Sequence, residues 1–462
     1  MSFDIGAELA DRAGESFALH EKYLNPQMVR VLKTIGFDRT YVRAEGPYLF
    51  DAGGARYLDL LSGFGVFAVG RSHPTIKQAL HDVLDADLPN LVQMDVSLLA
   101  GLLAERLLSH MPGQEKLFFC NSGTEAVEAG IKLARAATGR AKLIFCDHAF
   151  HGLTMGALSL NGDASFRDGF GPLLADSVRV PFNDLPALER ALAADDVAAF
   201  FVEPIQGKGV NVPAPDYLVE AARLCREHGA LFVADEVQTG IGRTGRFLAI
   251  DHVGVDPDLV LLAKALSGGF VPVGAVAGKR WIFDKLFNRM DRAVVHGSTF
   301  AKNNLAMAAG LATLAVLEDE RLIANAAERG ESLLRRLSAL KTKYEMLADV
   351  RGQGLMIALE FGPPKSLALR AAWTLLEKAT KGLFCQTVII PLFARHRVLS
   401  QVAGHEMYVI KLLPPLCLSA TDEDWIVRAF DDVIADCHRM PSSIWDLATT
   451  LAGNTLKRKA GT

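Results

Sequence analysis

Short apolar runs alternate with amphipathic stretches from about residue 98 to residue 300. The runs predict strands that are buried on both faces, and the stretches between them carry apolar residues at helical spacing. Repeated units of this kind predict an α/β fold, in which a mostly parallel sheet has helices on both faces and binds ligands at the carboxyl ends of its strands. We expect strands at residues 116–120, 142–146, 197–202, 231–234, 259–262 and 274–277, and helices that begin at residue 97 or span 125–137 and 216–227.

The two ends of the chain have different patterns. Residues 1–40 look helical, and residues 48–61 are typical of a hairpin with its turn at Gly53 and Gly54. A long helical stretch at 303–340 leads into a region of mixed pattern that predicts a smaller α+β domain. We therefore expect an N-terminal helical segment and hairpin at 1–60, a large domain at 61–325, a small C-terminal domain at 326–441 and a tail at 442–462.

Composition and charge narrow the class of protein. The formal net charge of the 462 residues is -4 with both signs interspersed, so no basic field predicts nucleic-acid binding and small molecules are the expected partners. The six cysteines show no Cys-x-x-Cys spacing, and no stretch reaches the roughly 18 apolar residues of a membrane span. We expect a cytoplasmic protein with no membrane span and no metal site.

Polar side chains follow two of the buried strands. Lys264 comes just after one strand, and Asp235 and Gln238 follow another, so an amine, an acid and an amide are expected at one sheet edge. An amine in a partly dry site forms Schiff bases, and a nearby carboxylate keeps a heterocyclic nitrogen protonated. The pattern predicts pyridoxal phosphate on Lys264. Alone, Lys264 could be a solvated lysine, and Asp235 could cap a helix or pair with Arg243 or Arg246.

Two further segments follow strands. Ser122, Gly123 and Thr124 open a helix, whose free amides and positive dipole end suit a phosphate monoester, although an ordinary helix cap explains them equally simply. Phe150 and His151 follow the next strand, where an aromatic ring could lie against a planar cofactor. Considered alone, Phe150 is more often a core residue.

Six motifs, in this order and spacing, resemble those of the class III (ω-type) aminotransferases, which are pyridoxal-phosphate enzymes of fold type I. The resemblance covers roughly residues 45–435 and is nearest to the ornithine, acetylornithine and putrescine branch. The motifs are Asn-Ser-Gly-Thr-Glu-Ala (121–126), Phe-His-Gly (150–152), Glu-Pro-Ile-Gln-Gly (203–207), Asp-Glu-Val-Gln-Thr-Gly-Ile-Gly-Arg-Thr-Gly (235–245), Leu-Ala-Lys-Ala-Leu-Ser-Gly-Gly (262–269) and Gly-Ser-Thr-Phe (297–300).

The resemblance implies a role for each matching residue. Lys264 would form the Schiff base and move the proton between substrate and cofactor carbons, and Asp235 would protonate the pyridine nitrogen. Gln238 would contact the ring oxygen, and Phe150 would stack on the ring with His151 beside it.

The remaining matches concern the phosphate and a second subunit. Gly123 and Thr124 would hold the phosphate with Ser122 beside them, and Glu203 would support the cofactor site. Thr299 would complete the phosphate site from the other subunit, which implies a homodimer.

Three lysines depart from the family pattern. Lys208 stands where the family usually has a glutamate, Lys411 replaces the arginine of a late Ile-Arg-x-x-Pro-Pro motif, and Lys302 lies in an altered Thr-Phe-Gly-Gly-Asn-Pro motif. They could accept an anionic group, although lysine lacks the bidentate geometry of arginine and each alone is more often solvated. The apolar stretch at 383–399 is longer than usual in this branch, which suggests either an apolar substrate or a larger interface.

The resemblance implies transfer of an amino group from a primary amine or amino acid, of the diamine or ω-amino type, to an oxo acid or aldehyde by a ping-pong mechanism. One alternative is amination of a hydrophobic or lipid-like aldehyde by the same chemistry. A second is an aminomutase or decarboxylase that uses the same Schiff base. A third is a binding protein that has lost catalysis.

Overall fold

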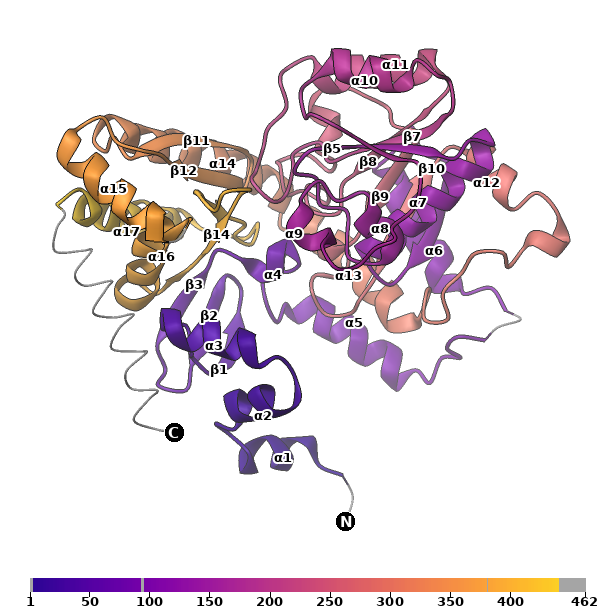
Figure 1. The fold of residues 1–462 in the computed structure, drawn as a ribbon. Helices are drawn as coiled ribbons and strands as arrows, with labels where there is room; N and C mark the ends of the chain where they lie inside the picture. Colours follow the sequence, from indigo (N-terminus) through magenta and orange to yellow (C-terminus); the bar gives the residue numbers. More distant parts are fainter. Residues whose placement is uncertain (1–2, 93–94, 380, 440–462) are drawn as a thin grey trace.

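A seven-stranded sheet forms the centre of the larger part of the molecule (Figure 1). The structure is a computed structural model that describes residues 3–92, 95–379 and 381–439. The strand order is β4-β10-β9-β8-β7-β5-β6, and every neighbouring pair is parallel except the two pairs that include β10. The strands are β4 (Lys116–Cys120), β5 (Lys142–Cys146), β6 (Ser177–Val180), β7 (Val197–Val202), β8 (Leu231–Asp235), β9 (Leu259–Leu262) and β10 (Gly274–Gly278).

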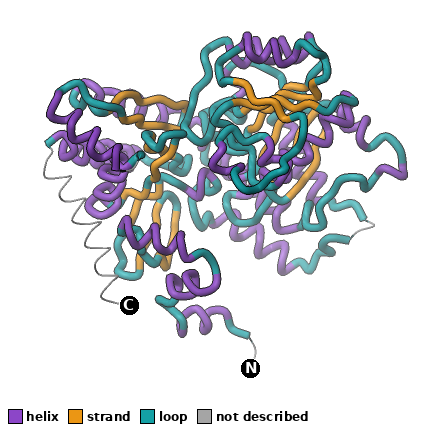
Figure 2. The backbone as a smooth tube through the Cα atoms, in the orientation of Figure 1, coloured by secondary structure: helices purple, strands orange, loops and turns teal. Residues whose placement is uncertain are grey.

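The central strand β7 is apolar and buried throughout because helices cover both faces of this sheet (Figure 2). Successive side chains of β7 belong to two different core clusters, with Phe200 in one and Phe201 in the other. This confirms the mostly parallel sheet with helices on both faces. The helices of this part are α5 (Pro74–Asp85), α6 (Leu98–Ser109), α7 (Gly123–Thr138), α8 (Met155–Ser159), α9 (Ala164–Arg167), α10 (Leu185–Leu192), α11 (Tyr217–Glu227), α12 (Arg280–Leu286) and α13 (Asn304–Asp319).

The N-terminal region confirms the predicted helices and hairpin. Three helices precede a sheet of order β1-β2-β3-β13, in which β2 and β3 are antiparallel and the late strand β13 joins β3 in parallel. A short helix, α4 (Ser62–Gly65), then connects this region to the larger part of the molecule. The elements are α1 (Ile5–Asp11), α2 (Ser16–Tyr23), α3 (Pro26–Ile35), β1 (Tyr41–Glu45), β2 (Tyr48–Asp51), β3 (Arg56–Asp59) and β13 (Val398–Leu399).

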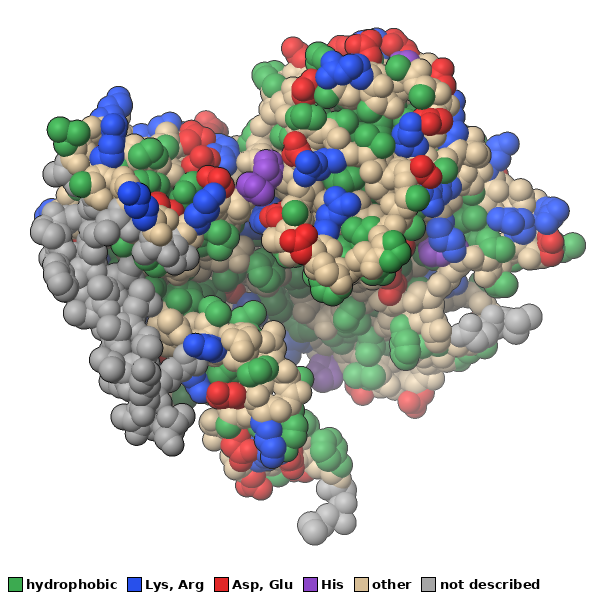
Figure 3. Space-filling model, in the orientation of Figure 1, with side chains coloured by type: hydrophobic (Ala, Val, Ile, Leu, Met, Phe, Trp, Pro, Cys, Tyr) green, Lys and Arg blue, Asp and Glu red, His purple; other side chains and the backbone are tan. Residues whose placement is uncertain are grey.

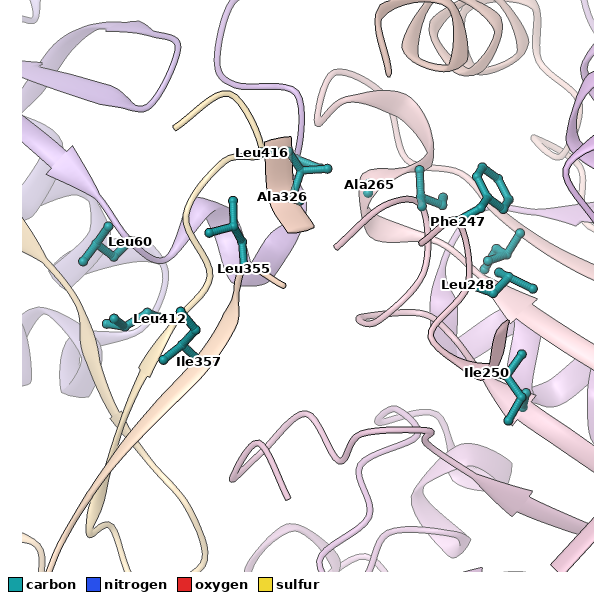
Figure 4. Close-up of a cluster of buried hydrophobic side chains, with 14 of the residues drawn as sticks. Leu60, Phe247, Leu248, Ile250, Ala265, Ala326, Leu355, Ile357, Leu412 and Leu416 are labelled. Atoms are coloured by element: carbon teal, nitrogen blue, oxygen red, sulfur yellow. The ribbon is translucent and has the colours of Figure 1, made fainter. Parts of the chain in front are cut away.

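The C-terminal region contains an antiparallel sheet of order β11-β12-β15-β14. Its core is continuous with that of the other two regions, since Leu60, Ile357 and Leu412 face one another (Figure 4). The elements are α14 (Leu322–Ala339), β11 (Leu347–Gln353), β12 (Met356–Phe361), α15 (Leu367–Ala379), α16 (Leu383–His396), β14 (Gln401–Ala403), β15 (Val409–Leu412) and α17 (Ala420–His438).

The helical stretch expected at 303–340 is confirmed. It consists of two helices, because Arg321 adopts a left-handed conformation with φ 53° and turns the chain between α13 and α14. The apolar stretch at 383–399 forms α16 and β13, and α16 packs on α17. Its side chains Phe384, Val388 and Leu392 are fully buried, so they serve the core rather than a substrate.

The division of the chain into four parts stays a prediction, and the tail at 442–462 lies outside the described residues. None of the described helices combines the length and the apolar character needed to cross a membrane.

Candidate active site

A cavity of about 970 Å³ opens beyond the carboxyl ends of β7, β8 and β9 and reaches the C-terminal sheet. The surface is recessed between the three regions, and hydrophobic side chains are exposed in the recess (Figure 3). The lining brings together Ser122, Gly123, Thr124, Phe150, His151, Glu203, Lys208, Asp235, Gln238, Lys264 and Lys411 from the predicted set.

Lys264 lies immediately beyond β9, at the start of a short 3-10 turn (Lys264–Ser267). Its backbone is left-handed with φ 41°, an uncommon conformation for a residue with a side chain, and such strain is often found at functional sites. Burial lowers the pKa of the Lys264 amine, while the negative charges of Asp235 and Glu203 oppose that shift. The amine makes no hydrogen bond or ion pair with any other residue that the structure describes, so it is available to react.

Asp235 ends β8, beside β9, and only 4% of its surface is exposed. Its Oδ2 accepts a hydrogen bond from His151 Nδ1 at 2.7 Å, and its Oδ1 accepts one from the Val237 amide at 3.1 Å. An ion pair with Arg243 or Arg246 is therefore the wrong alternative, because both guanidinium groups donate to backbone carbonyls.

His151 is buried beneath the cavity. Burial alone would lower its pKa, but the hydrogen bond and the negative charge of Asp235 outweigh burial and raise it. The Nε2 atom is buried and has no hydrogen-bond partner in the described structure. The hydrogen bond from His151 holds the Asp235 carboxylate in one orientation.

Glu203 follows β7 and connects two loops by hydrogen bonds. Its carboxylate accepts hydrogen bonds from the Phe150 amide at 2.9 Å and from the Gly207 amide at 2.7 Å. Burial raises the pKa of Glu203, although both amides favour its charged form. Because both oxygens are held by backbone amides, Glu203 positions Phe150 and the loop after β7.

The N-terminus of α7 forms one end of the cavity. Ser122 caps the helix by accepting a hydrogen bond from the Glu125 amide at 3.2 Å, and the amides of Gly123 and Thr124 have no partner within the helix. A Cβ atom on Gly123 would lie 2.7 Å from Val237 Cγ1, so only glycine fits there without displacing Val237. Such a helix start binds phosphate well.

This arrangement fits pyridoxal phosphate. A reactive amine, a carboxyl group for a ring nitrogen and an anion-binding helix start face the same cavity. The ring of Phe150 lines it too, and it packs edge-on against Phe166 with centroids 5.3 Å apart. The Gln238 side chain donates to the carbonyl of Phe64 at 3.1 Å, which holds the amide at the cavity wall.

The three unusual lysines have different surroundings. Lys411, on β15, is 4% exposed and donates to the Gly207 carbonyl at 2.8 Å and to Gln238 Oε1 at 3.4 Å. Burial, helped by repulsion from Lys264, lowers the pKa of Lys411 to about 8. Lys208 lines the cavity, but its ammonium is already paired with Asp163.

Lys302 and Thr299 are exposed and lie outside the lining of the cavity that this chain forms. The structure therefore does not bring Lys302 to this cavity. Thr299 was expected to act in the site of another subunit, and its exposure is compatible with that expectation.

The sequence interpretation missed several lining residues. Val237 packs against Gly123 from within the Asp-Glu-Val-Gln motif, where its place between Asp235 and Gln238 was a usable signal. Phe166 and Met407 come from a short helix and from the loop between β14 and β15, and no pattern in the sequence marks either.

Known proteins of similar sequence and structure support this description. The aminotransferase PigE of Serratia sp. (strain ATCC 39006) is 35% identical over 447 residues, which cover 90% of this chain and 52% of PigE. The chain thus spans about half the length of that relative. Among solved structures, an ornithine aminotransferase from Toxoplasma gondii with partial occupancy of PLP matches with a TM-score of 0.82 and 29% identity, over 95% of this chain and 99% of that one.

An amine transaminase from an uncultivated Pseudomonas species, solved in its PLP-bound form, matches with a TM-score of 0.75 and 30% identity, over 87% of this chain and 96% of that one. These likenesses confirm the fold-type I architecture. The family model for class III aminotransferases matches residues 12–434. The chain therefore belongs to the class III aminotransferase family.

Proposed function

We propose that this protein uses pyridoxal phosphate to move an amino group between a primary amine or amino acid, of the diamine or ω-amino type, and an oxo acid or aldehyde by a ping-pong mechanism. The observation that carries the proposal is the free amine of Lys264 facing the same cavity as Asp235 and the start of α7. The likeness to ornithine aminotransferases and to an amine transaminase supports it.

The bound cofactor supplies the electron sink for this chemistry. Lys264 would hold the cofactor covalently and, when freed by the substrate amine, would carry a proton between two carbons as a neutral amine. Its lowered pKa favours that neutral form. Asp235, oriented by the hydrogen bond from His151, would hold a proton on the ring nitrogen.

The remaining residues position the cofactor. The amides of Gly123 and Thr124 would bind the phosphate with Ser122 beside them, and Phe150 would stack on the ring. Glu203 acts indirectly through the Phe150 and Gly207 amides.

The active unit in this proposal is a homodimer. Thr299 is exposed and lies in a segment that also exposes Val294 and Phe300, at 90% and 64%. Exposed apolar side chains beside a site-completing threonine are what a subunit contact requires. Thr299 then binds the phosphate in the partner's cavity.

A second candidate substrate class is a hydrophobic or lipid-like aldehyde. The lining of the cavity also includes the apolar residues Phe64, Val66, Phe166 and Met407. Such a wall stabilises an alkyl chain by removing it from water, at roughly 0.8 kcal/mol per buried CH₂.

The test follows the visible absorption of the cofactor while candidate amines are added singly to the purified holoenzyme. Conversion of the yellow form by ornithine, putrescine or alanine supports the proposal, and conversion only by long-chain amines selects the hydrophobic class. Lys264→Ala should abolish conversion, whereas Lys285→Ala, which changes an exposed lysine of α12, should retain it. Turnover that survives in Lys264→Ala would refute the proposal, and release of carbon dioxide from the donor would indicate a decarboxylase.

A further inference from the structure

We infer that Asp163 determines the substrate specificity of this site by holding Lys208 away from the substrate, so that the outer part of the cavity accepts uncharged apolar chains and rejects a second carboxylate. This inference rests on the proposed function, because it concerns the substrate of the same cavity.

Asp163 lies just before α9 and is only 6% exposed. Its Oδ1 accepts hydrogen bonds from the Ser165 amide at 2.9 Å and from the Ser165 hydroxyl at 2.8 Å, which caps the short helix. Its Oδ2 pairs with the ammonium of Lys208, and His405 Nδ1 lies 3.7 Å from the same oxygen. One buried carboxylate thus connects three segments of the cavity wall.

Lys208 is the cation that the Asp163 carboxylate holds away from the substrate. Its side chain lines the cavity, and its ammonium lies 4.9 Å from the centroid of the Phe166 ring. Its backbone is fixed as well, since its carbonyl accepts a hydrogen bond from the Gly404 amide at 2.9 Å. The ammonium therefore faces a carboxylate on one side and an aromatic ring on the other.

Asp163 already neutralises the ammonium of Lys208, so an anionic substrate group gains the full attraction of Lys208 only by displacing Asp163. Displacement would leave a buried carboxylate without its partner, which is strongly unfavourable. Burial raises the pKa of Asp163, but hydrogen bonds from Lys208 and Ser165 outweigh burial and hold the pKa well below its usual range. Asp163 therefore stays ionised and keeps Lys208 as its partner.

The other cation near the substrate is Lys411, which lies deep in the cavity within the electrostatic range of Lys264. An anionic group of the substrate is therefore favoured only at the inner end. Beyond it, Phe166 and Met407 present apolar surface. The matching amino acceptor carries at most one carboxylate, close to the reacting carbon, and an uncharged tail.

The experiment compares kcat/KM for 2-oxoglutarate with kcat/KM for pyruvate as amino acceptors for the holoenzyme. We expect the wild-type protein to prefer pyruvate by at least about tenfold, because the second carboxylate finds no free cation. Asp163→Asn keeps the oxygen that caps α9 but removes the charge, so Lys208 becomes free. The ratio should then shift toward 2-oxoglutarate by about tenfold or more.

Two further variants test whether the freed ammonium of Lys208 causes the change in the ratio. Asp163→Asn combined with Lys208→Met removes the freed cation and should return the ratio to within about threefold of wild type. Asp147→Asn is the matched control, because it breaks the Arg179 ion pair outside this cavity and should leave the ratio unchanged.

A ratio for Asp163→Asn within twofold of wild type, or a wild-type preference for 2-oxoglutarate, would overturn the inference. A wild-type preference for 2-oxoglutarate overturns the inference even if Asp163→Asn does not fold. Failure of the wild-type holoenzyme to transfer an amino group to any acceptor would instead overturn the proposed function.

Discussion

Replacement of Lys411 by methionine tests the electrostatics of the cavity directly. Lys411 is a buried ammonium whose hydrogen bonds go to two neutral oxygens, and it has no ion pair within the described part of the chain. Its pKa is lowered to about 8, whereas an unperturbed lysine has a pKa of about 10.4. Methionine keeps the length of the side chain and removes the charge.

The size and sign of the effect follow from this difference. A shift of about 2.4 pKa units corresponds to ~3 kcal/mol of destabilisation of the folded protein by the charged form. Below about pH 8 the lysine is charged in both states and the destabilisation is fully present. Between about pH 8 and 10.4 the folded state is neutral while the unfolded state still binds a proton, so stability rises with pH.

Wild type should therefore gain about 2.5 kcal/mol from this group between pH 7 and pH 10, and Lys411→Met should lack that gain. The variant also loses two hydrogen bonds, each worth about 1 kcal/mol, but that loss is the same at both pH values. Only the change with pH is diagnostic.

The assay is urea denaturation of the cofactor-free proteins at pH 7 and pH 10, with the free energy of unfolding compared between variants. Lys285→Met, which changes an exposed lysine, is the control and should follow wild type. If Lys411→Met also follows wild type within about 0.5 kcal/mol, the ammonium is not buried as described and the reasoning fails.

Three further substitutions have defined outcomes. His151→Ala removes the 2.7 Å hydrogen bond to Asp235 and should weaken cofactor binding by about 10- to 100-fold in a fluorescence titration, because bonds between charged groups contribute ~1.5–3 kcal/mol; unchanged affinity would contradict the role given to His151. Gly123→Ala places a Cβ atom 2.7 Å from Val237 Cγ1 and should cost ~1–3 kcal/mol of cofactor binding or of stability. The same titration and thermal unfolding measure the two quantities, and no loss in either would show that Val237 can move aside without cost. Lys411→Arg should improve kcat/KM for donors with an α-carboxylate because arginine binds carboxylates in a bidentate manner; unchanged kinetics for every donor would remove Lys411 from the substrate site.

The sequence predicts six of the seven strands of the central sheet, because each of the six is a short, mainly apolar run between clear breaks. It misses β6, in which Ser177 and Arg179 interrupt the apolar pattern. It also places Lys264 and Asp235 at one edge, since both follow strands whose carboxyl ends meet. The antiparallel direction of β10 has no such signal, because a buried strand has the same pattern in either direction. The turn at Arg321 contains no glycine or proline that would reveal it.

Contacts that depend on the order of strands could not be predicted. His151 follows β5 and Asp235 ends β8, and β7 lies between those strands, so their hydrogen bond requires the complete sheet. Asp163 and Lys208 are 45 positions apart and meet only because α9 folds back over the loop after β7. The sequence shows that Lys208 replaces the family's usual glutamate. It does not show that Asp163 is the partner of Lys208.

The cavity is lined by parts of the chain that the ribosome synthesises at very different times. Lys411 donates to the Gly207 carbonyl across 204 positions, and Arg243 donates to the carbonyl of Pro414 across 171. During synthesis the strands that bear Asp235 and Lys264 leave the ribosome long before β14 and β15. A nascent chain that ends before residue 400 has the reactive amine but lacks the wall with Lys411, so the cofactor has its complete site only after β15 has been made.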